Sequence, residues 1–315
     1  MVFRSWWRNR ARLLIAAGCL LPAGCRTPSA PRSTAPAGTE IIVAGKGFPA
    51  GTRVVTWLEP GGFNAYATRK PLYGRRPSAK GKKDRDPTVR ELQRQVDQFV
   101  LHYDGGGLSR ICFDVLQKRG LSVHFLLDVD GTIYQTLDLQ ERAWHAGTAN
   151  DRSIGVEIAN LGAYPPAEAK VLAEWYQRGP AGQTRLVPPK AAGDGRVRTP
   201  NFQGRPQRPD PVRGKVNGRE LVQYDFTPEQ YAALIKLTAA LHRIFPQIAL
   251  DYPRDAQGRL VTGQLTDKQL AAFRGVLGHF HVSASKYDPG PAFQWEAVII
   301  RARREPSSAR TSDRP

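Results

Sequence analysis

The pattern of apolar and polar positions predicts several strands from residue 96 onward. Apolar runs at residues 96–103 and 153–159 have the length and composition of buried strands. Two further runs, at 123–127 and 132–136, flank Asp128-Val129-Asp130-Gly131. Asp-Gly suits the positive φ angles of a tight turn, so these two runs are expected to form a β-hairpin.

Helical patterns alternate with these strands. A helix is expected with Ser109 as its capping residue and a stop at Gly120. Thr227-Pro228-Glu229-Gln230 combines a capping hydroxyl, a proline in the first turn and a glutamine that completes a capping box. Thr266-Asp267-Lys268-Gln269 predicts another helix start. Strands mixed with helices indicate an α/β or α+β domain over about 96–304.

Two stretches lie outside this pattern. Residues 41–95 are predicted to be a basic N-terminal extension that begins with a short β-rich lead-in. Within it, residues 69–94 carry ten Lys or Arg and three acids. This run is either a solvated loop or a surface that contacts the cell wall or a membrane. Residues 163–222 are rich in Pro, Gly and Arg with little periodicity, which indicates a long loop insertion.

The first 25 residues have the layout of a secretory signal. A basic start precedes an apolar run at 13–21, and the segment ends in Leu21-Pro22-Ala23-Gly24-Cys25. Small residues before a cysteine resemble a bacterial lipobox, which predicts lipidation of Cys25. Cys19 is a weaker alternative, and a plain signal peptide is a third. The run is well short of the ~20 residues that span a membrane.

These features predict where the protein acts. Residues 1–25 would direct export, and 26–40 would form a flexible tether because they are rich in Pro, Ser, Thr and Ala. A lipid on Cys25 would anchor the protein in the periplasm, and the following Arg26 favours the outer membrane. Residues 305–315 are expected to be a disordered tail.

The charge of the chain favours a polyanionic partner. Lys and Arg number 46 and Asp and Glu 28, which gives a net charge of +18. Nucleic acid, anionic lipid and acidic wall polymer all fit. No zinc finger, helix-turn-helix or RNA-recognition pattern is present, and export argues against nucleic acid. Without the signal segment only Cys112 remains, so stability must come from the core, a metal, or both.

The histidines are the strongest candidates for chemistry. A catalytic zinc needs about three protein ligands and an open position for water, and His and Asp supply suitable atoms. Zinc lowers the pKa of that water, and a nearby carboxylate can remove its proton. Glu157 lies inside an apolar strand, which is costly unless its carboxylate faces a polar site. The six histidines are His102, His124, His145, His242, His279 and His281.

Five local motifs occur in a recognisable order. They are Phe99-Val100-Leu101-His102-Tyr103; Val123-His124-Phe125-Leu126-Leu127; Ala143-Trp144-His145-Ala146-Gly147; Asn150-Asp151-Arg152-Ser153-Ile154-Gly155-Val156-Glu157-Ile158; and Gly278-His279 followed by Lys286-Tyr287-Asp288-Pro289-Gly290. The series resembles the type-2 N-acetylmuramoyl-L-alanine amidase family, which shares its fold with peptidoglycan recognition proteins and T7 lysozyme. The resemblance covers about 96–164 and 227–300. It implies a central mixed β-sheet flanked by helices.

The resemblance also implies a set of roles. His102, His279 and Asp288 match the zinc ligands of the family. Glu157 matches the catalytic carboxylate that acts as general base, and Lys286 matches a lysine that stabilises the oxyanion. The substrate would be the amide bond between N-acetylmuramic acid and L-alanine in peptidoglycan or muropeptides. His145 is expected to line the substrate groove, with Trp144 and Asn150 as supporting residues.

Some positions leave alternatives open. The stretch from Gly-His to the ligand Asp is about one residue shorter than is usual in the family, so His281 is a rival ligand to His279. His124 is expected to support the site rather than bind metal, and His242 is expected to be structural. The same fold also serves as a non-catalytic peptidoglycan-binding module, although those relatives commonly lose a zinc ligand that this chain retains.

Overall fold

The computed structural model describes residues 38–77, 85–180, 182–193 and 197–306. The predicted signal peptide with Cys25 therefore lies outside the described residues, as do most of the predicted tether and tail. Among the residues described, no helix is both long and apolar enough to cross a membrane. Cys112 is a buried free thiol.

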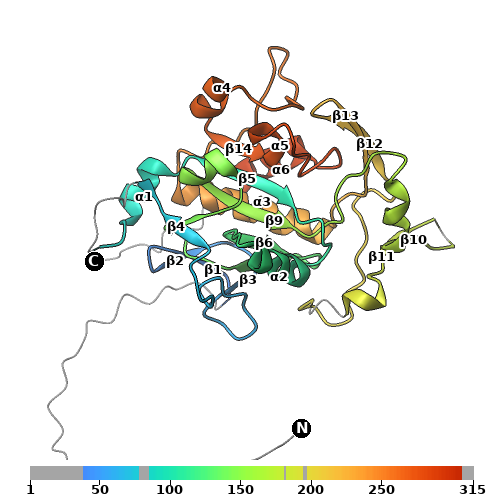
Figure 1. Ribbon diagram of the computed structural model, residues 1–315, viewed down its shortest axis with the longest axis horizontal. Helices are drawn as coiled ribbons and strands as arrows, with labels where there is room; N and C mark the ends of the chain where they lie inside the picture. The colour runs from blue at the N-terminus through green and yellow to red at the C-terminus, as the bar shows by residue number, and fades with distance from the viewer. Residues whose placement is uncertain (1–37, 78–84, 181, 194–196, 307–315) are drawn as a thin grey trace, which may run out of the picture. The chain divides into compact units, whose positions relative to one another are not determined.

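A six-stranded mixed sheet forms the centre of the fold (Figure 1). Every neighbouring pair is parallel except β6 and β7, which form the predicted antiparallel hairpin. The sheet confirms the expected α/β architecture with a central mixed sheet. In spatial order the strands are β14 (Gly275–Gly278), β5 (Gln98–Tyr103), β9 (Ser153–Ile158), β6 (Phe125–Leu127), β7 (Ile133–Gln135) and β3 (Val54–Thr56).

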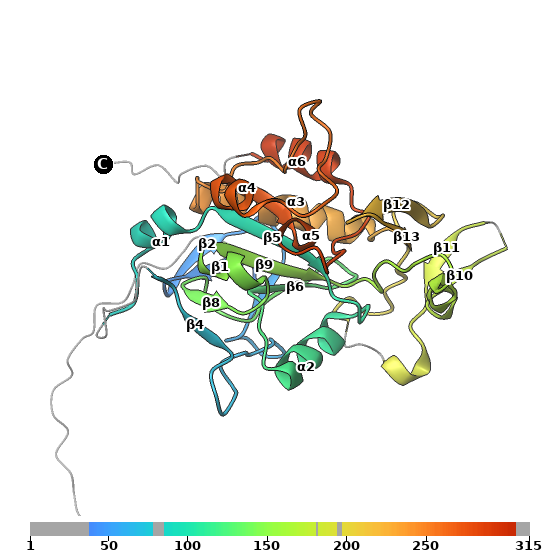
Figure 2. The ribbon, with the colours of Figure 1, turned by 45° about the horizontal axis from the view of Figure 1, so that its top comes forward.

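Helices cover both faces of this sheet. α3 (Pro228–Ile244) and α6 (Trp295–Arg304) pack together on one face, and α2 (Ser109–Arg119) lies on the other (Figure 2). The capping box at Thr227 and the left-handed stop at Gly120 both form as predicted. The start of α2 differs by one position, because Leu108 is the N-cap and Ser109 is the first helical residue.

The largest hydrophobic core lies between α3 and the sheet. Tyr231, Leu234 and Leu241 from the helix belong to one buried cluster with Phe99 and Val156 from the central strands. Strands buried on both faces are rich in apolar residues, as β5 and β9 are. The core therefore fixes β5 and β9 at the middle of the domain.

The N-terminal extension contributes to the same sheet. A hairpin of β1 (Glu40–Val43) and β2 (Lys46–Pro49) leads into β3, which pairs in parallel with β7. Next, β4 (Tyr73–Arg75) pairs with β8 (Glu141–Ala143), and α1 (Val89–Gln95) begins at a capping box on Thr88. The described residues before 96 are thus part of the same domain, because β3 extends its central sheet.

The 163–222 segment contains regular structure that its composition did not indicate. Its two antiparallel hairpins are β10 (Tyr176–Arg178) with β11 (Thr184–Leu186), and β12 (Val212–Val216) with β13 (Arg219–Gln223). It also holds the 3-10 turns Ala169–Glu174 and Lys190–Ala192. Trp175 and Leu172 pack in a second core with Leu108 and Leu161, which ties this segment to the domain.

The remaining helices lie near the C-terminal end of the chain. α4 (Asp267–Ala272) begins at the predicted cap Thr266 and precedes β14. α5 (His279–Val282) follows β14 directly, and a loop connects it to α6. A further 3-10 turn, η2 (Gly147–Asp151), precedes β9.

Candidate active site

Three parallel neighbours bring the predicted residues to one edge of the sheet. His102 is the penultimate residue of β5, and Glu157 holds the same place in β9 and is its direct register partner. β14 lies on the other side of β5, and His279 follows its last residue. Because parallel strands end at the same edge, these side chains converge there, as they commonly do in α/β folds.

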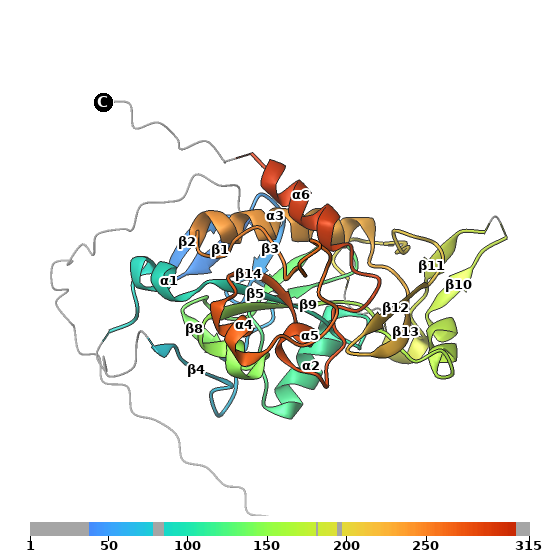
Figure 3. The same cartoon turned by 90° about the horizontal axis from the view of Figure 1, so that it is seen from above.

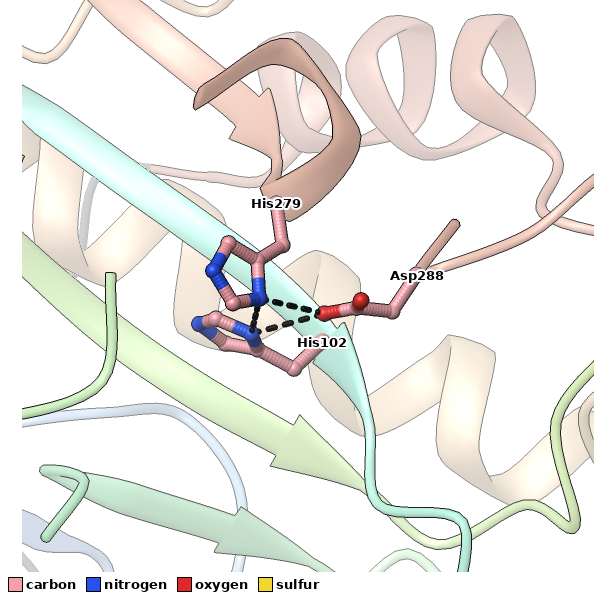
Figure 4. Close-up of side chains that lie close together, drawn as sticks. All are labelled: His102, His279 and Asp288. Carbon is pink, nitrogen blue, oxygen red and sulfur yellow. Dashed lines mark hydrogen bonds and ion pairs between the residues drawn. The ribbon is translucent and has the colours of Figure 1, made fainter. Parts of the chain in front are cut away.

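His102, His279 and Asp288 form a compact cluster (Figure 4). The Nδ1 atoms of the two histidines lie 3.0 Å apart, and the Oδ2 atom of Asp288 lies 2.8 Å from His102 Nδ1 and 3.0 Å from His279 Nδ1. Two imidazole nitrogens and one carboxylate oxygen that face a common point are a donor set that suits zinc. The residues present therefore fit the metal that the sequence predicts.

The protonation states also fit a cation. Burial, together with the neighbouring His279, lowers the pKa of His102 to about 4. Burial by itself would raise the pKa of Asp288, but hydrogen bonds from His102 and His279 outweigh it and lower that pKa. Neutral imidazole and ionised carboxylate are the forms that bind metal.

Glu157 lies across from this cluster. Its side chain is half-buried and lines the same cavity as His102, His279 and Asp288. Burial raises the pKa of Glu157 well above its ordinary value, and the carboxylates of Asp288 and Asp104 add to the effect. A carboxylate with a raised pKa is better matched to accepting a proton near neutral pH.

The cavity above the cluster holds about 320 Å³. Lys286 also lines it, and a neighbouring cavity of about 520 Å³ shares Trp144, His145, His279 and Lys286 with it. The two cavities therefore form one continuous depression over the cluster. Its volume leaves room for part of an organic ligand as well as for an ion or water.

His145 links this depression to the cluster. Its Nδ1 atom lies 3.0 Å from His102 Nε2, and its Nε2 atom lies 3.3 Å from the hydroxyl of Ser153. A ligand histidine commonly donates its second ring N–H to a partner that fixes its orientation. Gly155 makes room for the ring, since a Cβ there would lie 2.5 Å from His145 Nδ1.

Asn150 supports the loop that carries His145. Its Oδ1 atom accepts from the backbone N–H groups of His145 at 3.2 Å and Ala146 at 2.7 Å. The side chain is buried, which agrees with a supporting place, although the residue also lines the wider cavity. Trp144 lines both cavities.

The rival ligand His281 faces away from the cluster. Its Nδ1 atom accepts from the backbone of Gly278 at 2.9 Å, and its Nε2 atom lies 2.8 Å from the carbonyl of Val261. Both ring nitrogens are occupied by backbone groups, so the structure brings His279 and not His281 to the cluster. His242 likewise bonds a backbone carbonyl, that of Ile248, at 2.8 Å.

Arg76 is the functional neighbour that the sequence reasoning missed. It lies in the basic run 69–94, yet its side chain is fully buried. Its guanidinium donates to the carbonyl oxygens of Leu139, Asn150, Asp151 and Ser153 at 3.0–3.4 Å. At this position the run is neither a solvated loop nor a contact surface. A charged residue in a charge-rich run carries no pattern that marks it as buried.

His124 lies between Arg76 and the site. Its Nδ1 atom accepts from the Gly155 N–H at 3.1 Å, so Nε2 carries the proton and donates to the Glu141 carbonyl at 3.1 Å. Burial and the charge of Arg76, 3.2 Å away, lower the pKa of His124 to about 3. His124 is therefore a neutral supporting residue outside the metal cluster.

Asp104 and Arg119 also line the smaller cavity and were not singled out from the sequence. One oxygen of Asp104 accepts from the backbone of Gly106, Gly107 and Asn160, and burial raises the pKa of its carboxyl to about 7. Asp104 directly precedes Gly105-Gly106-Gly107, which was the available clue to a tight, side-chain-capped turn.

A cluster of two histidines and an aspartate beside a half-buried glutamate, at the C-terminal ends of the central strands, is an arrangement typical of metal-dependent hydrolases. Residues 92–180 match the family model described as N-acetylmuramoyl-L-alanine amidase. Residues 92–180 thus carry the sequence pattern of this amidase family, and the match supports an enzyme of that class. No curated protein matches it in sequence.

Several solved amidase structures are similar to the chain. The endolysin amidase LysCS from Clostridium intestinale is 14% identical, with a TM-score of 0.38 over 80% of this chain and 95% of that one. AmpD is 18% identical, with a TM-score of 0.35 over 78% and 95%. AmiD from E. coli is 20% identical, with a TM-score of 0.35 over 66% and 57%. At this level of similarity no residue role is transferred from them.

Proposed function

We propose that this protein is a zinc-dependent amidase that hydrolyses the amide bond between N-acetylmuramic acid and L-alanine of peptidoglycan or muropeptides. The observation that carries the proposal is the convergence of His102, His279 and Asp288 to within 3.0 Å of one another. Glu157 and Lys286 line the cavity above them. When bound, zinc would supply a Lewis acid that polarises the scissile carbonyl and acidifies water.

The side chains have separate tasks in this reaction. Glu157 takes the proton of the attacking water and passes it to the amine of the departing peptide, so that protons balance over the cycle. The ammonium of Lys286 faces the carbonyl oxygen as negative charge develops on it. His145 holds the ring of His102, which keeps its Nδ1 atom directed toward His279 and Asp288, where zinc would bind.

The experiment compares purified wild type with Glu157→Gln, which keeps the shape of the side chain but cannot accept the proton. Glu174→Gln is the matched control because Glu174 is an exposed glutamate outside the cavity. Zinc content and cleavage of muropeptides, with and without an anhydro end, are measured by mass spectrometry. We expect one zinc per chain in all three proteins and free stem peptide from wild type and Glu174→Gln only.

Two outcomes would contradict the proposal. Bound zinc without cleavage of any muropeptide would favour the non-catalytic peptidoglycan-binding module. Absence of zinc from the wild type would show that His102, His279 and Asp288 are not its ligands.

We also propose that the protein is exported to the periplasm and anchored to the outer membrane through a lipid on Cys25. The support is the basic, apolar and small-residue order of residues 1–25. Labelling with a radioactive fatty acid should mark the wild type and not Cys25→Ser, and the wild type should fractionate with outer membranes. A labelled Cys25→Ser protein would rule out this attachment site.

A further inference from the structure

The β12–β13 hairpin ends in a turn that reaches the loop carrying Lys286 (Figure 3). Asn217 and Gly218 form the turn with φ angles of 47° and 76°, as Asn-Gly does in tight hairpins. The amide nitrogen of Asn217 donates to the carbonyl oxygens of Lys286 at 2.8 Å, Ser283 at 3.2 Å and Phe280 at 3.3 Å. One side chain therefore holds both ends of the loop.

The same residue is itself fixed from the other side. Its Oδ1 atom accepts from the backbone N–H of Gln264 at 2.8 Å, and its own N–H donates to the carbonyl of Thr262 at 2.9 Å. All the hydrogen-bonding groups of the Asn217 amide are thus directed at backbone. A side chain used in this way sets the position of the chain that it binds.

Contacts continue along the hairpin toward Asp288. Arg219 donates to the Tyr287 hydroxyl at 3.2 Å, and its guanidinium lies 5.6 Å from the centre of that ring. The amide of Gln223, which is fully buried, donates to the carbonyl of Pro289 and accepts from the N–H of Ala292, both at 3.0 Å. The hairpin therefore contacts the chain both before and after the candidate ligand Asp288, at Tyr287 and at Pro289.

The part of the loop around Lys286 needs such support because it has little packing of its own. Ala284 and Ser285 are exposed, and Lys286 is only half-buried. A lysine side chain is long and flexible, so the position of its charge depends on where its backbone is held. The segment matched by the family model ends at residue 180, before the hairpin begins.

We propose that Asn217 is a positioning residue that sets Lys286 against the scissile carbonyl, and that the β12–β13 hairpin is a template for the loop between His279 and Asp288. This inference rests on the proposed amidase reaction for its effect on rate. The template itself is a property of the chain, and it can be measured without substrate.

The experiment uses three variants of the full protein. Asn217→Gly keeps the positive φ of the turn and removes the amide. Asn217→Asp also suits the turn, since Asp-Gly forms the same type, but it places a carboxylate against three carbonyl oxygens. Lys215→Ala is the control, because Lys215 lies on the same hairpin and pairs with Glu220 at the exposed surface.

Hydrogen exchange of the backbone amides of residues 280–287 is measured first. We expect faster exchange in Asn217→Gly and Asn217→Asp and wild-type exchange in Lys215→Ala. With muropeptide, we expect kcat to fall about 10- to 100-fold in both Asn217 variants, with KM and zinc content unchanged. A turn with only a structural role would tolerate Asp as well as Asn.

A double-mutant cycle tests the route through Lys286. Asn217→Gly should cost little further activity in a protein that already carries Lys286→Ala, because the group that it positions is gone. A full, additive loss in that background would overturn the route, and unchanged exchange of 280–287 would overturn the template. A wild type that does not cleave muropeptide would refute the proposed function, while the exchange comparison would still decide the template.

Discussion

His102 and Glu157 lie side by side on β5 and β9, whereas His279, Lys286 and Asp288 follow one another in the segment after β14. The first pair is held by the backbone ladder of a sheet with strands on both sides. The second group depends on side chains of the β12–β13 hairpin, chiefly Asn217 and Gln223. His102 and Glu157, the strand half of the site, are thus fixed by the register of neighbouring strands. His279, Lys286 and Asp288, the loop half, are fixed by contacts between distant segments.

In both halves, one polar side chain donates hydrogen bonds to several backbone carbonyl oxygens. In the strand half, the buried guanidinium of Arg76 donates hydrogen bonds to carbonyl oxygens in η2 and at the start of β9. In the loop half, the side-chain amide of Asn217 donates hydrogen bonds to the carbonyl oxygens of Phe280 in α5, Ser283 and Lys286. Buried carbonyl groups need donors, so a single polar side chain can fix a loop that has no ladder of its own.

The largest effect is expected when one metal ligand is removed from either half. His102→Ala and Asp288→Ala should each lose bound zinc and at least about 1,000-fold in activity, since the Lewis acid is worth several kcal/mol. His242→Ala is the control, because His242 bonds a backbone carbonyl away from the cluster. Metal analysis and muropeptide cleavage check this. Zinc retained at wild-type affinity in His102→Ala would contradict the assignment of His102 as a zinc ligand.

A smaller effect should distinguish the halves by function. Lys286→Met removes the charge and keeps the apolar stem, and we expect kcat to fall about 100- to 1,000-fold, as for the loss of one oxyanion donor. Zinc content should not change, because the candidate ligands are His102, His279 and Asp288, and lysine is not among the usual ligands of zinc. Steady-state kinetics with metal analysis measures both. An equal loss of zinc and rate would mean that the lysine supports the metal instead.

Replacing Arg76, which supports the strand half, should lower the free energy of unfolding. Arg76→Met leaves several buried carbonyl oxygens without a donor, and we expect it to cost about 3 kcal/mol of unfolding free energy. Arg90→Met, at an exposed position of α1, is the control and should change it by less than about 0.5 kcal/mol. Urea unfolding followed by circular dichroism measures both. Equal stability of the two variants would show that water replaces the guanidinium.

The sequence predicts the strand half better than the loop half. His102 and Glu157 lie in short segments rich in apolar residues, and such segments predict buried strands from local pattern alone. The capping boxes at Thr227 and Thr266 likewise locate α3 and α4 within a residue or two. These features depend on short-range chemistry, and the structure confirms them.

The parts that were not predicted depend on long-range contacts. β14 is short, and two of its residues are glycines, so no periodicity marks it. The burial of Arg76 depends on carbonyl oxygens from residues far along the chain. The β12–β13 hairpin did carry a local clue, the Asn217-Gly218 dipeptide that is typical of tight hairpin turns, but the surrounding Pro, Gly and Arg obscured it.

The choice between His279 and His281 illustrates the same limit. Both lie in one buried turn, and composition does not separate them. The decision comes from Gly278 and Val261, whose backbone groups bond both nitrogens of His281. Only the folded chain shows that these partners are present.

The smallest expected effect is a shift in pH dependence that links the two halves through charge. Glu157 must be ionised to take a proton, so activity should fall as the pH drops through its raised pKa. Burial is the main cause of that raised pKa, followed by Asp288 on the loop half and Asp104 beyond the end of β5. Asp288 is a proposed ligand, so Asp104 is the carboxylate that can be neutralised without removing the metal.

Asp104→Asn keeps the oxygen that accepts three backbone N–H groups and removes the negative charge. The pKa of Glu157 should then decrease, and the acidic limb of kcat/KM should move to lower pH by up to about one unit. Asp114→Asn, on the exposed side of α2, should leave the limb in place. An acidic limb that does not move in Asp104→Asn, or that moves to higher pH, would mean that a group other than Glu157 titrates there.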